Sequence, residues 1–153
     1  MLRVDKAVRP PGLIRSAKTY SLFFGSDCLY AIAVGPASMK VGHINTSEVV
    51  GSLVGKIVSA PIENAFANAY APKIAVGEAA IDVTKLSELA KAKHNFIITF
   101  SSITEVVVAT DLVQGSYLKL VFAGEKLKFI FRDKTKTEIE SLAQNFGHQV
   151  TVK

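Results

Sequence analysis

The chain has 153 residues, of which 49% are hydrophobic and 20% are charged. This length supports one domain with a substantial core and makes two independently stable domains marginal. The net charge of +5 and the pI of about 9.4 permit an anionic partner without specifying one. Because Lys and Arg are spread along the chain with no basic run, the sequence disfavours nucleic acid as that partner.

Three features of the sequence bear on its location. The single cysteine, Cys28, excludes an intramolecular disulfide and favours a reducing compartment. Met1–Ser16 is basic but contains no apolar segment, so no secretory signal is predicted. The longest stretch without a charged residue is 12 residues, shorter than the roughly 18–20 that a membrane-spanning helix needs. We therefore expect a soluble cytoplasmic protein and leave peripheral association with a membrane open.

The N-terminal part predicts an arm followed by a hairpin. Met1–Pro11 is basic and ends in two prolines, which is typical of a flexible arm. Leu13–Phe24 is expected to be a strand, and Gly25–Asp27 a turn. Cys28–Val34 predicts a second strand, which ends at Gly35-Pro36 because proline lacks the N–H that a ladder needs. Both faces of this second strand are apolar, so we expect it to be covered on both sides.

Residues 45–94 differ from their surroundings, because apolar residues recur there at helical spacing. Thr46 or Ser47 is expected to cap a first helix, which must kink at Pro61 and break again at Ala71-Pro72. Val83–Ala90 predicts a second helix. Thr84 is its expected cap, and Glu88 is expected near its first turn.

This predicted helical insertion carries a row of small residues. Gly51 and Gly55 have the spacing that lets another helix approach closely. Three roles stay open for the insertion: it covers a face of the sheet, it associates with a second copy or a partner protein, or it contacts a membrane surface. Its charged residues argue against full insertion into a bilayer. The residues predicted for an oligomer interface are Gly51, Val54, Gly55, Val58, Ile62 and Phe66.

Asn95–Gly147 has the clearest periodicity in the chain. Strands are expected at Phe96–Phe100 and Ile103–Thr110, on either side of a polar Ser-Ser break. Tyr117–Phe122 and Lys126–Arg132 alternate in polarity and are joined by a short Ala-Gly-Glu turn, which predicts an antiparallel hairpin. Its buried face is expected to hold Leu118, Leu120, Phe122, Leu127, Phe129 and Phe131.

A capped helix is predicted after this hairpin. Thr135 and Glu138 have the spacing of a capping box, and Gly147 is a suitable residue for the position after the helix. Gln149–Val152 is expected to add a short final strand. The apolar stripe that should dock the helix on the sheet consists of Ile139, Leu142, Ala143 and Phe146.

The runs FFGSDCLYAIAVG and FIITFSSITEVVV, the alternating hairpin and the amphipathic C-terminal helix together resemble the pleckstrin-homology-like superfamily. The resemblance is to its GRAM and bacterial PH-like branch, and it covers residues 13–35 and 95–153. It implies one α+β, mainly β domain: a bent antiparallel barrel with a C-terminal capping helix, interrupted here by the insertion. Members of this superfamily are mostly binding modules for lipid headgroups, peptides or proteins, and they are not usually enzymes.

The basic motif that phosphoinositide-binding members carry across their first hairpin is missing here. Lys18 stands alone in that hairpin, and its turn contains Asp27. No lipid-binding residue is therefore carried over from the superfamily.

No residue set in the sequence demands a particular chemistry. The three histidines, His43, His94 and His148, are far apart, so we expect no metal site. Cys28 is interpreted as a buried structural thiol in preference to a reactive one. Neither a phosphate-binding loop nor a nucleophile motif is present in the sequence, and we predict neither a cofactor nor an enzymatic activity.

We therefore predict a non-enzymatic binding or assembly module that acts through protein or homo-oligomer contacts of the insertion. The alternative is peripheral binding to anionic membrane lipid through a basic sheet face. Basic groups close to an anionic surface contribute roughly 1 kcal/mol each, although a solvated face that discourages edge pairing has the same appearance. The four residues expected on that face are Lys119, Lys126, Lys128 and Arg132.

Overall fold

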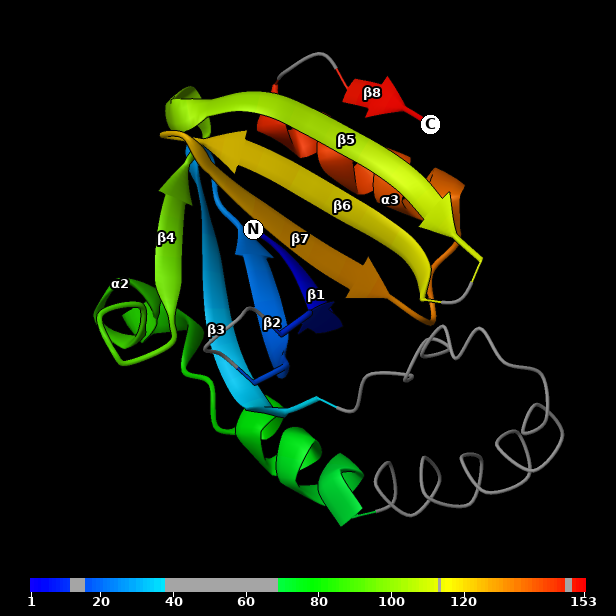
Figure 1. Cartoon of the computed structure of the whole chain (residues 1–153). Coiled ribbons are helices and arrows are strands. Elements are labelled where there is room, and N and C mark those ends of the chain that lie inside the picture. The colour runs from blue at the N-terminus through cyan, green and yellow to red at the C-terminus, as the bar shows by residue number, and fades with distance from the viewer. Residues whose placement is uncertain (12–15, 38–68, 113, 148–149) are drawn as a thin grey trace, which may run out of the picture.

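The computed structural model describes residues 1–11, 16–37, 69–112, 114–147 and 150–153. These residues form an open, mixed, eight-stranded sheet with a few helices, so the fold is α+β and mainly β, as the sequence predicts. The strand order is β4-β3-β2-β1-β7-β6-β5-β8, which leaves β4 and β8 at the edges. Figure 1 shows that β5, β6 and β7 run across the direction of β2 and β3, so the sheet is strongly bent.

The N-terminal residues form strand β1 (Leu2–Arg9), and the prediction of a flexible arm is wrong. β1 pairs antiparallel with β2 along its length, with an irregularity between Val4 and Ala7. Val4, Ala7 and Val8 are buried. The irregularity interrupts the strict alternation of buried and exposed residues, and charged residues lie between the apolar ones, so the sequence does not show a strand here.

The predicted hairpin is present as β2 (Lys18–Phe24) and β3 (Cys28–Pro36). Leu29 faces the main core, whereas Ile32 packs in a second cluster on the opposite face, so β3 is covered on both sides as predicted. Strand β4 (Phe96–Thr99) pairs antiparallel with the other side of β3.

Three further strands form an antiparallel meander: β5 (Ile103–Asp111), β6 (Gly115–Phe122) and β7 (Glu125–Phe131). The polar break before β5 is the 3-10 turn η2 (Phe100–Ser102). Ala123 and Gly124 have φ angles of 48° and 79°, as in a two-residue type I′ turn. The predicted inward face is buried except for Phe122, which is half-buried, and Ile130 on the opposite face is buried as well.

Helix α3 (Lys136–Ala143) carries the predicted capping box. The Thr135 backbone N–H donates to the Glu138 carboxylate at 2.7 Å, and the Glu138 N–H donates to the Thr135 hydroxyl at 3.3 Å. The bond from the Thr135 N–H, followed by one from the Thr135 hydroxyl to the same carboxylate at 2.8 Å, holds the pKa of Glu138 below its ordinary value. The 3-10 turn η3 (Gln144–Phe146) continues the helix to Gly147, whose φ of 66° is the expected left-handed terminus.

The main core lies inside the bend of the sheet and against α3. It contains the predicted stripe of α3 and η3: Ile139, Leu142, Ala143 and Phe146. The Phe146 ring lies 5.4 Å from that of Phe24 and 5.2 Å from that of Phe100, measured between centroids. Strand β8 (Val150–Val152) follows, as predicted, and pairs parallel with β5.

The first part of the predicted insertion, with its expected cap at Thr46 or Ser47 and its kink at Pro61, lies outside the described residues. Residues 69–79 form a helix that continues through Pro72, so the predicted break at Ala71-Pro72 is wrong. A proline removes one backbone donor from a helix, and here the other residues of the helix sustain it.

The second predicted helical segment is present as η1 (Val83–Lys85) and α2 (Leu86–Leu89), but its cap is Asp82 and not Thr84. The Asp82 carboxylate accepts hydrogen bonds from the Thr84 N–H at 3.0 Å and the Thr84 hydroxyl at 2.6 Å. These bonds, the hydroxyl bond first, lower the pKa of Asp82. Both residue types are good caps, so sequence alone does not decide between neighbours two positions apart.

The described part of the insertion covers the outer face of β2 and β3. Leu86 packs with Phe23 and Ile32 in the second cluster. Gly77 lies so close to β3 that a Cβ atom added to it would collide with the Val34 backbone. These residues therefore fill the first of the three roles considered for the insertion, which is to cover a face of the sheet.

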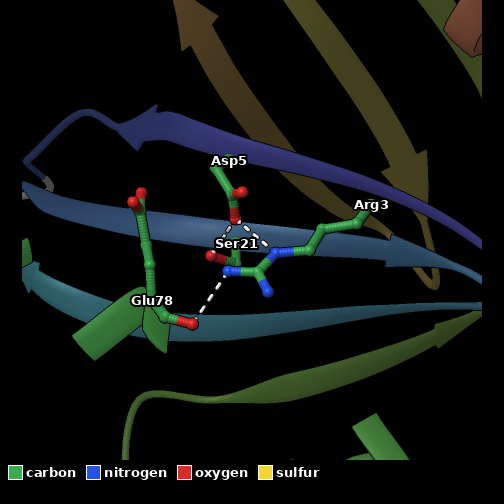
Figure 2. A network of polar contacts seen from close by, with 4 residues as sticks. All are labelled: Arg3, Asp5, Ser21 and Glu78. Atoms are coloured by element: carbon green, nitrogen blue, oxygen red, sulfur yellow. Dashed lines mark hydrogen bonds and ion pairs between the residues drawn. The ribbon is translucent and has the colours of Figure 1, made fainter. Parts of the chain in front are cut away.

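A polar network also ties the helix of residues 69–79 to the sheet (Figure 2). The Arg3 Nε donates to the Asp5 carboxylate at 2.8 Å, and its Nη2 donates to the Glu78 backbone oxygen at 2.8 Å. The Ser21 hydroxyl donates to the same Asp5 oxygen. Arg3 thereby links β1 to the helix, and Asp5 links β1 to β2.

Candidate functional site

A cleft of about 810 Å³ opens where β1 ends and where β2, β4 and β7 begin. Segments from all four strands contribute to its lining: Arg9–Pro11, Lys18 and Tyr20, Lys93–Ile98, and Glu125–Lys128. β4 and the start of β7 are far apart in the strand order, but the sheet is strongly bent (Figure 1), and residues of both line this cleft. The volume lies within the roughly 300–1,000 Å³ typical of ligand sites.

The local sequence explains why the strands begin and end at this cleft. Pro10 and Pro11 carry no backbone N–H, so β1 ends where the chain reaches the cleft. Asn95 fixes the corner before β4. Its side-chain oxygen accepts from the Ala33 N–H at 2.8 Å, and its side-chain nitrogen donates to the Leu89 carbonyl at 2.8 Å. One side chain therefore joins β3, α2 and the start of β4.

Aromatic rings form one wall of the cleft. Tyr20 and Phe96 line it, with ring centroids 5.6 Å apart, and Phe129 lies behind both at 5.9 and 6.3 Å. The Tyr20 hydroxyl donates to the His94 carbonyl at 3.0 Å. The Arg9 guanidinium lies 5.4 Å from the Phe96 centroid, so a cation–π contact holds this charged group against the aromatic wall.

The charge of the lining is strongly positive. Its five cations and one carboxylate are Arg9, Lys18, Lys93, Lys126, Lys128 and Glu125. Among the described residues, no carboxylate forms an ion pair with any of the five cations. Lys128 is held by neutral groups instead: its Nζ lies 4.1 Å from the Tyr117 centroid and donates to Gln114 Oε1 at 3.2 Å, and neither of these two residues lines the cleft. Cations gathered in a concave site raise the local concentration of anions.

The four basic residues predicted from the sequence separate into two groups. Lys126 and Lys128 line the cleft, whereas Lys119 and Arg132 do not. Lys119 is the cross-strand partner of Lys128, and its Nζ lies 3.9 Å from the Glu105 carboxylate.

Three cations of the cleft were not predicted as site residues: Arg9, Lys18 and Lys93. Arg9 and Lys18 are register partners at the last position of the β1–β2 ladder. A strand prediction for the N-terminal residues would have placed these two side by side. No local pattern marks Lys93, because it shares the cleft with the start of β7 only through contacts between distant segments of the chain.

The predicted oligomer interface cannot be placed on this fold. Its residues, from Gly51 to Phe66, lie outside the described part of the chain. Assembly through them stays a prediction.

The acids and the phenol with shifted pKa values lie outside the cleft. Burial and the charge of Asp5 raise the pKa of Glu78, and a hydrogen bond with Cys28 raises that of Tyr30. Cys28 is buried. Among the described residues, no group of three or more His, Cys, Asp or Glu side chains is arranged to hold a metal ion. The described helices include none that is long and apolar enough to cross a membrane.

Comparison of the chain with protein-family models, with curated proteins and with solved structures gives no significant match. The cleft is therefore interpreted from its own geometry and charge.

Proposed function

We propose that this protein is a non-enzymatic binding module that takes an anionic ligand in the basic cleft. The observation that carries the proposal is the set of five basic residues that line one cleft without an ion-pair partner among the described carboxylates. Keeping like charges together has an electrostatic cost, and an anionic ligand would relieve it.

The fold that we propose for this module is the PH-like barrel expected from the sequence. Two features support it. Phe146 packs beside Phe24, at the end of β2, so the α3–η3 segment covers one end of that strand. The cleft lies at the opposite end of β2, beside Lys18 and Tyr20. A capping helix at one end and a binding site at the other would suit a module of this kind.

Triphosphate is a suitable first probe, because it carries negative charge without a peptide backbone or an apolar tail. We expect ¹⁵N NMR titration to move the amide signals of Lys18, Lys126 and their neighbours. Each cation contributes roughly 1 kcal/mol of attraction, and 1.4 kcal/mol corresponds to a tenfold change in affinity. Because charge reversal also introduces repulsion, Lys18→Glu and Lys126→Glu should each weaken binding by roughly ten- to thirtyfold at low salt.

The matched control is Lys153→Glu, which makes the same charge change at an exposed residue outside the cleft. Lys153→Glu should change the affinity for triphosphate by no more than about twofold if binding depends on the lysines of the cleft and not on the net charge of the protein. Equal weakening by all three substitutions, or titration without any shift at the cleft, would overturn the proposal.

A membrane lipid headgroup is one source of the anion, and vesicle sedimentation separates it from a soluble one. If membrane lipid is the ligand, anionic vesicles should bind better than neutral vesicles at low salt, and Lys126→Glu should reduce that binding. A loss caused by Lys119→Glu and Arg132→Glu, but not by Lys18→Glu, would assign membrane binding to the predicted sheet face and not to the cleft. Triphosphate binding without vesicle binding would identify a soluble ligand.

A further inference from the structure

Strand β4 is an edge strand with one partner among the described strands, β3. Phe96, Ile97 and Ile98 of this strand line the cleft. An unpaired strand edge offers backbone donors and acceptors at regular spacing.

The ladder between β3 and β4 shows which residues of β4 direct their backbone groups away from β3. The Phe100 N–H donates to the Asp27 carbonyl at 2.7 Å, which continues the β3–β4 register by one pair. Hydrogen-bonded and non-hydrogen-bonded pairs alternate in an antiparallel ladder, so Ile98 and Phe96 also bond to β3. Ile97 and Thr99 therefore direct their backbone groups away from β3.

Three backbone groups on this edge remain without an assigned partner among the described residues. The Thr99 carbonyl accepts from the Ser102 hydroxyl at 2.7 Å, which leaves the Thr99 N–H and both backbone groups of Ile97. Ile97 is 43% exposed, so the described neighbouring residues do not cover this position of the β4 edge.

A second unpaired edge borders the same cleft. The described ladder between β1 and β7 consists of the pair Val8↔Ile130, and Pro10 and Pro11 follow without donors. In the two-residue β6–β7 hairpin, Glu125 is hydrogen-bonded to β6, so by alternation Lys126 and Lys128 direct their backbone groups to the other side. Both lysines line the cleft.

We propose that an extended acidic segment of a partner protein binds in this cleft by adding a strand to the edge of β4 that is opposite β3 and has no strand partner among the described residues. The backbone groups of Ile97, which lines the cleft, and of Thr99, the next outward-directed residue on the same edge, pair with the peptide backbone, and the basic residues of the lining select its carboxylates. This inference rests on the proposed anion-binding function and adds the class of ligand. A polypeptide fits better than a compact anion because only a polypeptide offers donors and acceptors at the spacing of a strand edge.

The probe is a fluorescent peptide of about six residues with alternating Glu and Val, long enough to pass the four residues of β4 at roughly 3.3 Å per residue. Its control is the same peptide with alternate backbone nitrogens methylated, which retains every charge and removes the donors of one edge. We expect the unmodified peptide to bind at least tenfold more tightly by fluorescence anisotropy. Its binding should slow amide hydrogen exchange at Ile97 and Thr99.

A substitution in the protein tests the same backbone pairing by removing a donor of β4. Ile97→Pro removes an outward backbone donor at an edge position, where proline is tolerated, and Ile97→Thr retains that donor. Ile97→Pro should weaken peptide binding at least tenfold and leave triphosphate binding unchanged, whereas Ile97→Thr should alter neither by more than about twofold.

The outcomes separate the two proposals. Equal binding of the methylated and unmodified peptides would overturn strand addition and leave anion binding in place, as would triphosphate binding without peptide binding. Failure of both triphosphate and peptide to bind would overturn both. If Ile97→Pro does not fold, the methylated peptide still decides the question on the wild-type chain.

Discussion

Glu78 is a carboxyl group in unfavourable surroundings. Its Oε1 atom is buried and has no hydrogen-bond partner among the described residues. Burial, followed by the negative charge of Asp5, raises the pKa of Glu78 above its ordinary value of 4.5, and Lys6 and Arg3 oppose this rise. The residue is also held in place, because its backbone oxygen accepts from Arg3 (Figure 2). The ionised side chain of Glu78 therefore destabilises the folded state, while its backbone oxygen helps to hold the helix on the sheet.

Glu78→Gln should change how stability depends on pH. The folded state disfavours the ionised carboxyl, so wild-type stability should fall as pH rises from about 4.5 through the higher pKa of the folded state. The variant should lack this decrease and gain stability relative to wild type across the same window. Urea unfolding at a series of pH values between about 4 and 8 measures the difference.

Glu140→Gln makes the same chemical change on α3 and serves as the control. Parallel pH profiles for wild type and Glu78→Gln would contradict the assigned surroundings of Glu78.

At the scale of elements, the helix of residues 69–79 and the segment after it are held to the sheet by close packing. A Cβ atom added to Gly77 would meet the carbonyl oxygen, the carbonyl carbon and the Cα of Val34, all of them backbone atoms that no side-chain rotation can move. Leu86 then packs on Phe23 and Ile32. A glycine in a helix lowers helix propensity, and here it permits the close approach.

Gly77→Ala should destabilise the protein although alanine favours helices. Propensity alone would add about 1 kcal/mol of stability, whereas overpacking typically removes about 1–3 kcal/mol. Because the obstacle is backbone, we expect a net loss and faster amide exchange in the helix, measured by urea unfolding and hydrogen exchange. Ala79→Ser, at an exposed position of the same helix, should have a small effect. A Gly77→Ala variant as stable as wild type would show that the helix does not pack this closely on β3.

At the scale of the whole molecule, the sequence also predicts assembly through the row of small residues that contains Gly51 and Gly55. Light scattering at high micromolar concentration should then give a mass above the 16.4 kDa of one chain, and Gly55→Leu should return it to that mass. Ala92→Leu, at an exposed position outside that row, is the matched control. A wild-type monomer that Gly55→Leu leaves unchanged would contradict assembly by this surface.

Local signals in the sequence determined much of this fold. The two-residue turn at Ala123-Gly124, the capping box at Thr135 and Glu138, and the glycine that ends the helix each depend on residues within a few positions of one another. The apolar face of β7 follows from alternation, and the unbroken apolar run in β3 indicates a strand that is covered on both sides. Strand β1 was missed because an irregularity breaks its alternation, and the Asp82 cap was missed because two good caps lie two residues apart.

Only the tertiary structure decided where the basic residues meet. The sequence predicted Lys119, Lys126, Lys128 and Arg132 as one set because they lie on neighbouring strands. The structure instead gathers Lys126 and Lys128 with Arg9, Lys18 and Lys93 around one cleft. Periodicity specifies which face of a strand is buried, since that is a property of consecutive residues. The order and bend of the strands depend on contacts between distant segments, and these contacts bring together cations that share no local pattern.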